Sequence, residues 1–426
     1  MPPVRTAVIL AVGSELLTPH RLDTNSLFLT ARLNDIGIDV VSKSVIGDNK
    51  TALAAAIRHA VEAEDLVVTT GGLGPTSDDL TREVVAEVLG LELVEDGEVL
   101  ESIRRRFERR GLHMPDGNRR QAAVPTGATV LANPNGTAPG LWLEAGSAVL
   151  VLLPGPPREM QPMFEAGVLP RLLERSGERR VVRRVIKIAG RPESHVEEIA
   201  NPIYVPFATG DTPIETTILA TPGQIELHLS ARGSDVAAMD NMLESAVDKL
   251  ARALAPAVFS VDGRSLEQVV GEQLQARGWK VAVAESCTGG LLGGRLTDVS
   301  GSSEWFAGGI VAYEDEVKRR LLGVDAAALE THGAVSESTA VAMADGVRER
   351  LAADAGVAIT GIAGPTGGSP EKPVGTVMIA VSAGPVVVRT YRFVGDRAMV
   401  RQQAVTAALE LLRQTLANQS QQTASR

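Results

Sequence analysis

Hydrophobic positions in the first 170 residues form short β-branched runs, separated by stretches in which apolar residues recur with helical spacing. The runs predict strands over residues 5–12, 38–46 and 65–70. The spaced stretches predict helices over residues 24–36, 50–63 and 78–89. Strands that alternate with helices in this way are typical of an α/β domain built on a parallel sheet.

A second pattern begins near residue 175. Apolar and polar residues alternate over 181–190 and 217–233, and one amphipathic helix is expected at 235–254. From residue 261 onward, strands and helices alternate again, so we predict an α/β protein with three domains and a polar, disordered tail. The expected parts are an N-terminal α/β domain at 1–174, a small α+β middle domain at 175–260, a C-terminal α/β domain at 261–418 and the tail at 419–426.

Composition narrows the classes of function. The 426 residues carry a net charge of −10, and only 3% of them are aromatic. Direct nucleic-acid binding is disfavoured, because it needs a basic surface and, for single strands, aromatic stacking platforms. The single cysteine excludes an internal disulfide and a CxxC metal site. Because no apolar run reaches the roughly 18 residues of a membrane span, we expect a cytoplasmic protein without a membrane segment.

The segment 284–290 (AESCTGG) is the strongest candidate for chemistry. It joins an expected strand to an expected helix, so Ser286 and Cys287 would lie at the carboxyl end of a strand, where open α/β sheets bind ligands. The backbone N–H groups that follow could stabilise an oxyanion or bind a phosphate. A glycine-rich turn with a capping hydroxyl is the structural alternative.

Two further segments of the C-terminal domain place polar residues at strand ends. One has Tyr313 near the end of a strand and Lys318 one turn into a helix. The other closes a strand with Thr360, Gly361 and Gly364. Three such loops predict a polar pocket at one sheet edge. No Ser–His–Asp order is evident, but a desolvated lysine can also serve as the base for a serine.

Residues 265–417 resemble the nicotinamide mononucleotide deamidase family, which forms the C-terminal domain of CinA (competence/damage-inducible) proteins. The resemblance runs through AESCTGG, GSSEWFAGGIVAYEDEVK, HGAVSES, TGIAGPTGG and KPVGTV. It implies hydrolysis of nicotinamide mononucleotide to nicotinate mononucleotide and ammonia without a cofactor. Ser286 would be the nucleophile and Lys318 its base, with Tyr313 beside them and backbone donors around 287–289 forming the oxyanion hole. The implied substrate-binding residues are Cys287, Thr288, Gly289, Gly290, Gly308, Thr360, Gly361 and Gly364. Asp315 stands where many relatives carry Asn.

The segment 70–79 (TGGLGPTSDD) of the N-terminal domain directly follows an expected strand. Its glycines let backbone amides approach a phosphate, and the helix expected to follow, capped by Thr76 or Ser77, adds its positive end. Asp78 and Asp79, expected in the first turn, could hold a divalent cation; a structural role at the helix start is the alternative. The expected nucleotide site comprises Glu15, Asn25, Gly71, Gly72, Gly74, Thr76, Asn135, Pro154 and Gly155.

These loops resemble the molybdopterin-binding (MoaB/MogA-like) fold found in the N-terminal half of CinA proteins, so the resemblance extends over the whole chain. It implies, in some members, an ADP-ribose pyrophosphatase that needs a divalent metal and yields AMP and ribose 5-phosphate. The same fold also binds molybdopterin, and the motifs do not separate the two roles. The family further implies a homodimer. Pro19 stands where relatives usually have Gly.

Two alternatives stay open at this point. A salvage enzyme would act on nicotinamide mononucleotide and ADP-ribose, whereas a binding or regulatory protein would act in competence or DNA repair through protein partners. The run 104–110 (RRRFERR) is interpreted mainly as a solvated helix face, with phosphate binding as the alternative.

Overall fold

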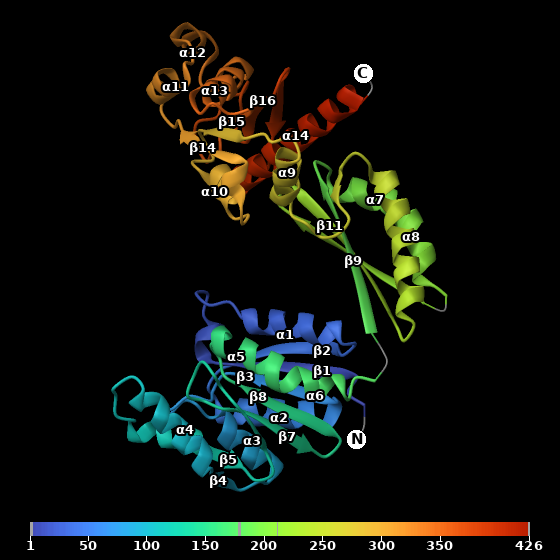
Figure 1. Ribbon diagram of the computed structural model, residues 1–426, viewed down its shortest axis with the longest axis vertical. Coiled ribbons are helices and arrows are strands. Elements are labelled where there is room, and N and C mark those ends of the chain that lie inside the picture. The colour runs from blue at the N-terminus through green and yellow to red at the C-terminus, as the bar shows by residue number, and fades with distance from the viewer. Residues whose placement is uncertain (1–2, 178–179, 211, 425–426) are drawn as a thin grey trace. The chain divides into compact units, whose positions relative to one another are not determined.

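The computed structural model describes residues 3–177, 180–210 and 212–424. The chain divides into two compact units, one built on the N-terminal 182 residues and one on the rest, except that Arg232–Ala237 belongs to the first. Both units contain sheets covered by helices (Figure 1), and the α/β fold class predicted from the sequence is confirmed.

The N-terminal unit is built on a six-stranded sheet with the order β2-β1-β3-β8-β7-β6. Strands β1, β2, β3 and β8 run parallel, and β7 is antiparallel to both of its neighbours. The strands of the unit are β1 (Thr6–Val12), β2 (Asp39–Ile46), β3 (Leu66–Thr70), β4 (Leu93–Glu95), β5 (Ala123–Pro125), β6 (Thr129–Leu131), β7 (Gly140–Ala145) and β8 (Ala148–Leu153). Strands β4 and β5 form a separate pair.

Helices cover both faces of this sheet. They are α1 (Thr24–Asp35), α2 (Lys50–Ala63), α3 (Thr81–Leu89), α4 (Gly97–Glu108), α5 (Pro157–Met163) and α6 (Leu169–Leu173). Successive residues of a strand point to opposite faces, so Ile9 of β1 packs with α1, α5 and α6, whereas Leu10 packs with α2, α3 and α4. Both faces of the sheet are therefore buried.

Helix α3 begins at Thr81, so the expectation of a helix from residue 78 is wrong. Leu80 is the N-cap, and no side chain caps the helix. Asp79 instead accepts a hydrogen bond from the Thr76 backbone N–H at 2.9 Å and another from the Thr76 hydroxyl. Such local side-chain bonds compete with helix formation, and they hold 76–79 as a turn before α3.

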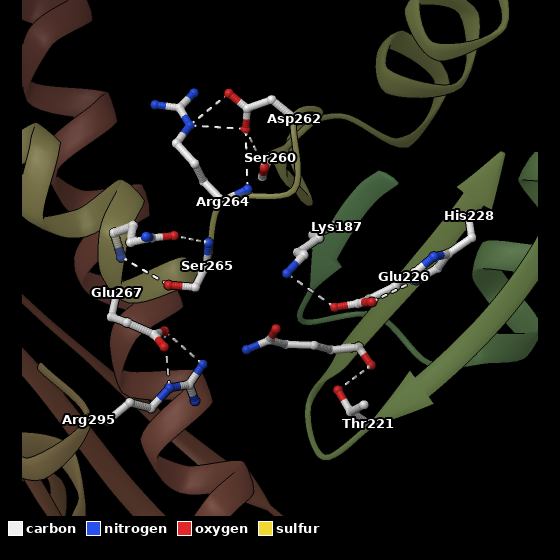
Figure 2. Close-up of polar contacts among 12 residues, drawn as sticks. Lys187, Thr221, Glu226, His228, Ser260, Asp262, Arg264, Ser265, Glu267 and Arg295 are labelled. Atoms are coloured by element: carbon white, nitrogen blue, oxygen red, sulfur yellow. Dashed lines mark hydrogen bonds and ion pairs between the residues drawn. The ribbon is translucent and has the colours of Figure 1, made fainter. Parts of the chain in front are cut away.

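The middle segment forms a four-stranded sheet with the order β10-β11-β9-β12. Its elements are β9 (Arg180–Ala189), α7 (Glu193–Tyr204), β10 (Ile214–Thr221), β11 (Gln224–Gly233), α8 (Val236–Leu254) and β12 (Val258–Ser260). The sequence predicted one helix here, but the βαββαβ order has two. Helix α7 was missed because it buries only Val196 and Ala200 and contains Pro202, so its apolar spacing is weak. Glu226 on β11 contacts two basic side chains (Figure 2). Its Oε1 lies 3.3 Å from Lys187 Nζ, and its Oε2 lies 2.8 Å from His228 Nε2.

The C-terminal segment has a five-stranded sheet with the order β14-β13-β15-β16-β17. Strands β14, β13 and β15 are parallel, and β16 and β17 follow antiparallel. The elements are α9 (Leu266–Gln275), β13 (Val281–Glu285), α10 (Leu291–Thr297), β14 (Phe306–Val311), α11 (Asp315–Leu322), α12 (Ala326–His332), α13 (Glu337–Arg350), β15 (Ala355–Gly361), β16 (Thr376–Ser382), β17 (Val386–Arg392) and α14 (Arg397–Ala424). Helices α9, α10 and α14 pack on one sheet face, and α11, α12 and α13 pack on the other.

Polar contacts hold the connection from β12 to α9 (Figure 2). Arg264 binds Asp262 at 2.8 Å and lowers the pKa of that carboxyl to about 2. Ser265 caps α9 and forms a reciprocal capping box with Gln268. Phe259 of β12 also joins the hydrophobic core of the C-terminal segment. The strand β12 at the end of the middle segment therefore packs against the core of the C-terminal segment.

The far end of the chain differs from expectation. Helix α14 continues to Ala424, so residues 419–424, predicted as part of a disordered tail, are helical; 425–426 lie outside the described residues. Among the helices of the described residues, none combines the length and apolar character needed to cross a membrane.

Candidate active sites

Ser286 lies where the three parallel strands of the C-terminal sheet end. It directly follows β13, and its backbone N–H donates to the Ile359 carbonyl of β15 at 2.9 Å. On the other side, the Ala312 N–H donates to the Glu285 carbonyl at 2.8 Å, which brings the end of β14 alongside. Ser286 is 8% exposed. The carboxyl edge of this sheet thus carries the predicted nucleophile, as open α/β sheets favour.

The start of α10 is occupied by a buried carboxylate. Glu285 accepts hydrogen bonds from the backbone N–H groups of Gly290, Leu292 and Gly293, at 3.0, 3.0 and 2.8 Å. A negative charge at a helix N-terminus satisfies its free donors and its dipole. The Gly290 amide is thus already bonded within the protein, and a part for Gly290 in substrate binding stays a prediction. Within the described residues, the Thr288 backbone N–H makes no hydrogen bond.

Lys318 of α11 is buried, with 1% of its surface exposed. Its Nζ donates to the Tyr313 carbonyl at 3.0 Å and to Asp315 Oδ1 at 3.1 Å. Because Tyr313 follows Ala312, the lysine head lies near the end of β14, next to the loop of Ser286. In the described structure, Lys318 Nζ and the Ser286 hydroxyl are not hydrogen-bonded to each other.

Cys287 is buried in the core behind the loop. Burial raises the pKa of its thiol to about 11. The thiol is therefore protonated at neutral pH, and a protonated thiol is a poor nucleophile. This chemistry favours Ser286 over its neighbour.

Two arginines on α14, which the sequence analysis missed, complete the site. Arg397 donates to the Tyr313 hydroxyl at 3.0 Å and to the Gly364 carbonyl at 2.8 Å. Arg401, one turn later, donates to the Thr288 carbonyl at 2.7 Å. Arg401 Nε and Thr288 Oγ1 are buried without a partner among the described residues. The spacing RAMVR at the start of a predicted helix was the signal that could have revealed the pair.

Other predicted residues of this site have structural roles. Gly308 lies on the edge strand β14, paired with Ala282 of β13, so it sits within the strand and not at the strand end that carries Ser286; its role in substrate binding stays a prediction. Thr360 is buried and donates to the Ala334 carbonyl at 2.8 Å, which ties β15 to the loop before α13. Gly361 packs so closely that an added Cβ would lie 2.7 Å from Val377. Gly364 contributes its carbonyl to Arg397, and Gly289 donates to the Ser286 carbonyl at 3.2 Å.

The predicted nucleotide residues of the N-terminal unit surround a cavity of about 360 Å³. Of the predicted residues, those that line it are Glu15, Gly71, Gly72, Gly74, Asp78, Asp79, Pro154 and Gly155. Asn25 stands behind them and donates to the Gly155 carbonyl at 2.7 Å, while its buried Oδ1 has no partner in the described residues. Thr76 and Asn135 do not line the cavity; Asn135 instead donates to the Arg158 carbonyl at 2.8 Å.

The glycine-rich loop needs its glycines and a buried arginine. Gly71 has a φ of 100°, and a Cβ there would lie 2.1 Å from the Val12 carbonyl oxygen. Arg82 of α3 is fully buried and donates to the carbonyls of Leu73 and Gly74, at 2.7 and 3.3 Å. Burial lowers the pKa of this guanidinium. Arg82 was also missed by the sequence analysis, because an arginine within a helix is ordinarily exposed.

The cavity is strongly acidic. Five carboxylates line it and no lysine or arginine does; they belong to Glu15, Asp48, Asp78, Asp79 and Glu159. We call it the acidic cavity. Across the described residues, no three of the acidic, histidine and cysteine side chains come close enough to form a metal site. Hydrogen bonding by Thr76 lowers the pKa of Asp78, which keeps that carboxylate ionised. Carboxylate oxygens are the kind of ligand that hard divalent cations such as magnesium prefer, and magnesium usually takes only one or two of them from the protein.

Comparisons with known proteins cover the whole chain. Three family models match: "Probable molybdopterin binding domain" over residues 8–174, "Damage-inducible protein CinA KH domain" over 183–260 and "CinA C-terminal domain" over 263–416. A CinA-like protein of Solibacter usitatus is 46% identical over 97% of this chain and 99% of its own length. A CinA-like protein of Koribacter versatilis is 46% identical over 96% of this chain and 99% of its own length. The solved competence/damage inducible protein CihA from Agrobacterium tumefaciens is 44% identical, covering 36% of this chain and 93% of that chain, with a TM-score of 0.35.

Proposed function

The chain belongs to the CinA family, and we propose that its C-terminal domain hydrolyses the carboxamide of nicotinamide mononucleotide, giving nicotinate mononucleotide and ammonia. The observation that carries this proposal is a serine at the carboxyl edge of a parallel sheet, with a fully buried lysine bonded to the Tyr313 carbonyl just past the end of the neighbouring strand β14. Nothing in this proposed reaction requires a cofactor. A salvage reaction on pyridine nucleotides would take place in the cytoplasm.

In the proposed mechanism, Lys318 accepts the hydroxyl proton of Ser286 while the serine oxygen attacks the carboxamide carbon. In this step the lysine acts as the neutral amine: its two N–H groups can keep donating to Tyr313 O and Asp315 Oδ1 while its lone pair accepts the serine proton. Catalytic hydrogen bonds are often incomplete before substrate binds. Backbone N–H groups of Cys287 and Thr288 are the nearest candidates to stabilise the oxyanion. Ammonia leaves with a proton returned by the lysine, and water then hydrolyses the acyl-enzyme.

The arginine pair supports a phosphorylated substrate. Arg397 and Arg401 bring two guanidinium groups to the rim of the Ser286 loop. Guanidinium groups bind phosphate through several charge-assisted hydrogen bonds. We propose that the two guanidinium groups hold the 5′-phosphate of the mononucleotide.

For the N-terminal domain we propose metal-dependent hydrolysis of ADP-ribose to AMP and ribose 5-phosphate. Without a cation, the carboxylates of the acidic cavity would repel a pyrophosphate. A divalent cation between the carboxylates and the phosphates would allow the pyrophosphate to bind there. When bound, the cation would neutralise phosphate charge. Asp78 and Asp79 are the residues that would hold it. Binding of a pterin or nucleotide without cleavage is the competing function.

Replacing Cys287 with alanine should leave most of the deamidase activity, because its buried, protonated thiol is not the attacking group. The wild-type enzyme should likewise resist thiol-alkylating reagents at neutral pH. The measurement is ammonia release from nicotinamide mononucleotide before and after alkylation. An inactive Cys287→Ala protein paired with an active Ser286→Ala protein would overturn the serine assignment.

Replacing both Asp78 and Asp79 with asparagine should abolish ADP-ribose cleavage and leave deamidation unchanged. The two carboxylates are the proposed cation ligands, and the deamidase residues belong to the other compact unit. AMP formation is measured with each of several divalent metals, with deamidation as the internal control. Wild-type protein that cleaves no ADP-ribose under any metal would leave only the binding function.

A further inference from the structure

A second cavity, of about 430 Å³, lies between α4 and the segment 130–139 of the N-terminal unit. Thr137 lines both this cavity and the acidic cavity, so the two adjoin. Its lining includes Arg106 and Arg109, whereas the acidic cavity has no cationic lining residue in the described structure. We call it the arginine cavity. Figure 1 shows α4 at one margin of the unit.

Helical phase separates the arginines of the run 104–110. Val99, Leu100 and Ile103 are the buried positions of α4. Arg106 follows Val99 by seven residues, so it borders the buried face and is half-buried, whereas Arg109 is the exposed residue just beyond the end of α4; both line the cavity. Arg104 and Arg105 fall on other faces and are exposed. The interpretation of the run as a solvated face thus holds for only part of it.

The cationic end of the cavity has little counter-charge. Arg106 donates to the Pro134 carbonyl at 2.9 Å, and the Arg109 side chain makes no ion pair or hydrogen bond within the described residues. The carboxylates that line the cavity belong to Asp96 and Glu98, at the opposite end of α4. Asp96 and Arg106 are ten positions apart, which is about 15 Å along a helix. Asp96 is already engaged, accepting from the Glu98 and Val99 N–H groups at 2.9 and 3.0 Å.

We propose that the arginine cavity is a phosphoryl-binding subsite of the N-terminal domain. A pyrophosphate placed at the boundary marked by Thr137 would face the carboxylates and their cation on one side and the two guanidinium groups on the other. Arginine and a metal ion commonly share the charge of a phosphoryl group in this way. That the ligand is a nucleotide pyrophosphate rests on the proposed function of this domain. That the cavity binds phosphoryl groups rests on its two arginines and does not depend on the proposed function.

The test is equilibrium binding of inorganic pyrophosphate and of ADP-ribose to the full chain, measured by titration calorimetry. Arg109→Glu should weaken pyrophosphate binding by about tenfold or more, since a charge-assisted hydrogen bond is replaced by repulsion. Arg104→Glu is the matched control, because it makes the same charge change on the same helix outside the cavity. Its binding should change by less than about twofold, as expected for an exposed charge screened by salt.

Equal weakening by both substitutions would show a general charge effect and overturn the subsite. Absence of pyrophosphate binding by the wild-type protein would overturn it as well. Hydrolysis of ADP-ribose is measured separately: wild-type protein that binds pyrophosphate through Arg109 but never cleaves ADP-ribose would reject the proposed activity and keep the subsite. Thermal melting of both variants checks that the fold is retained.

Discussion

Ser286→Ala and Lys318→Ala should each reduce the kcat of nicotinamide mononucleotide deamidation by on the order of 100-fold or more. The first removes the attacking oxygen, and the second removes the group that accepts its proton. KM should change much less, because neither side chain is among the proposed phosphate-binding residues. Ammonia release under saturating substrate measures kcat directly.

Controls separate chemistry from folding. Lys318 is buried, so its truncation leaves a cavity and destabilises the domain. Lys318→Met keeps most of the side-chain volume but cannot accept a proton, and it should be as inactive as Lys318→Ala while melting closer to the wild-type protein. Ser303→Ala, at an exposed position, is the control for the serine. Retention of substantial activity by Lys318→Met would contradict the role of the lysine as base.

Periodicity predicted β1, β2 and β3 of the N-terminal sheet, and the AESCTGG motif predicted the loop that carries Ser286, because these signals are local. The alternation of apolar runs around Val283 and Ile359 is itself enough to place Ser286 at a strand end. The sequence did not reveal that the backbone N–H groups at the start of α10 already donate to Glu285, which belongs to the preceding strand. A glutamate at the end of a strand gives no local sign that it turns back onto the next helix.

Contacts between distant segments were the least predictable part. Arg397 and Arg401 lie more than 80 residues from Tyr313 and Thr288, with which they bond. Periodicity cannot report which strand end a helix start will meet, because that depends on sheet order. Arg82 was missed for a related reason: its buried state is visible only once the glycine-rich loop is seen to fold over it.

Glu285→Ala should abolish most deamidase activity although Glu285 does not take part in the chemistry. The substitution leaves three backbone N–H groups at the start of α10 without their acceptor, and each unsatisfied buried donor costs about 1–3 kcal/mol. The loop that carries Ser286 and the proposed oxyanion donors should then lose its fixed geometry. Loss of a single oxyanion donor alone lowers kcat by about 100-fold or more in other hydrolases.

Glu285→Gln provides the graded test. The amide oxygen of the glutamine can still accept from some of the three N–H groups, but its NH2 group would face the remaining N–H donors. The kcat of the Glu285→Gln protein should therefore fall between those of the Glu285→Ala and wild-type proteins. Because Glu285 acts as a positioning residue for Ser286 and its loop, kcat should fall more than KM rises. Glu304→Gln, an exposed glutamate of the same domain, is the control. A Glu285→Ala protein with unchanged kcat would show that the carboxylate serves only the stability of α10.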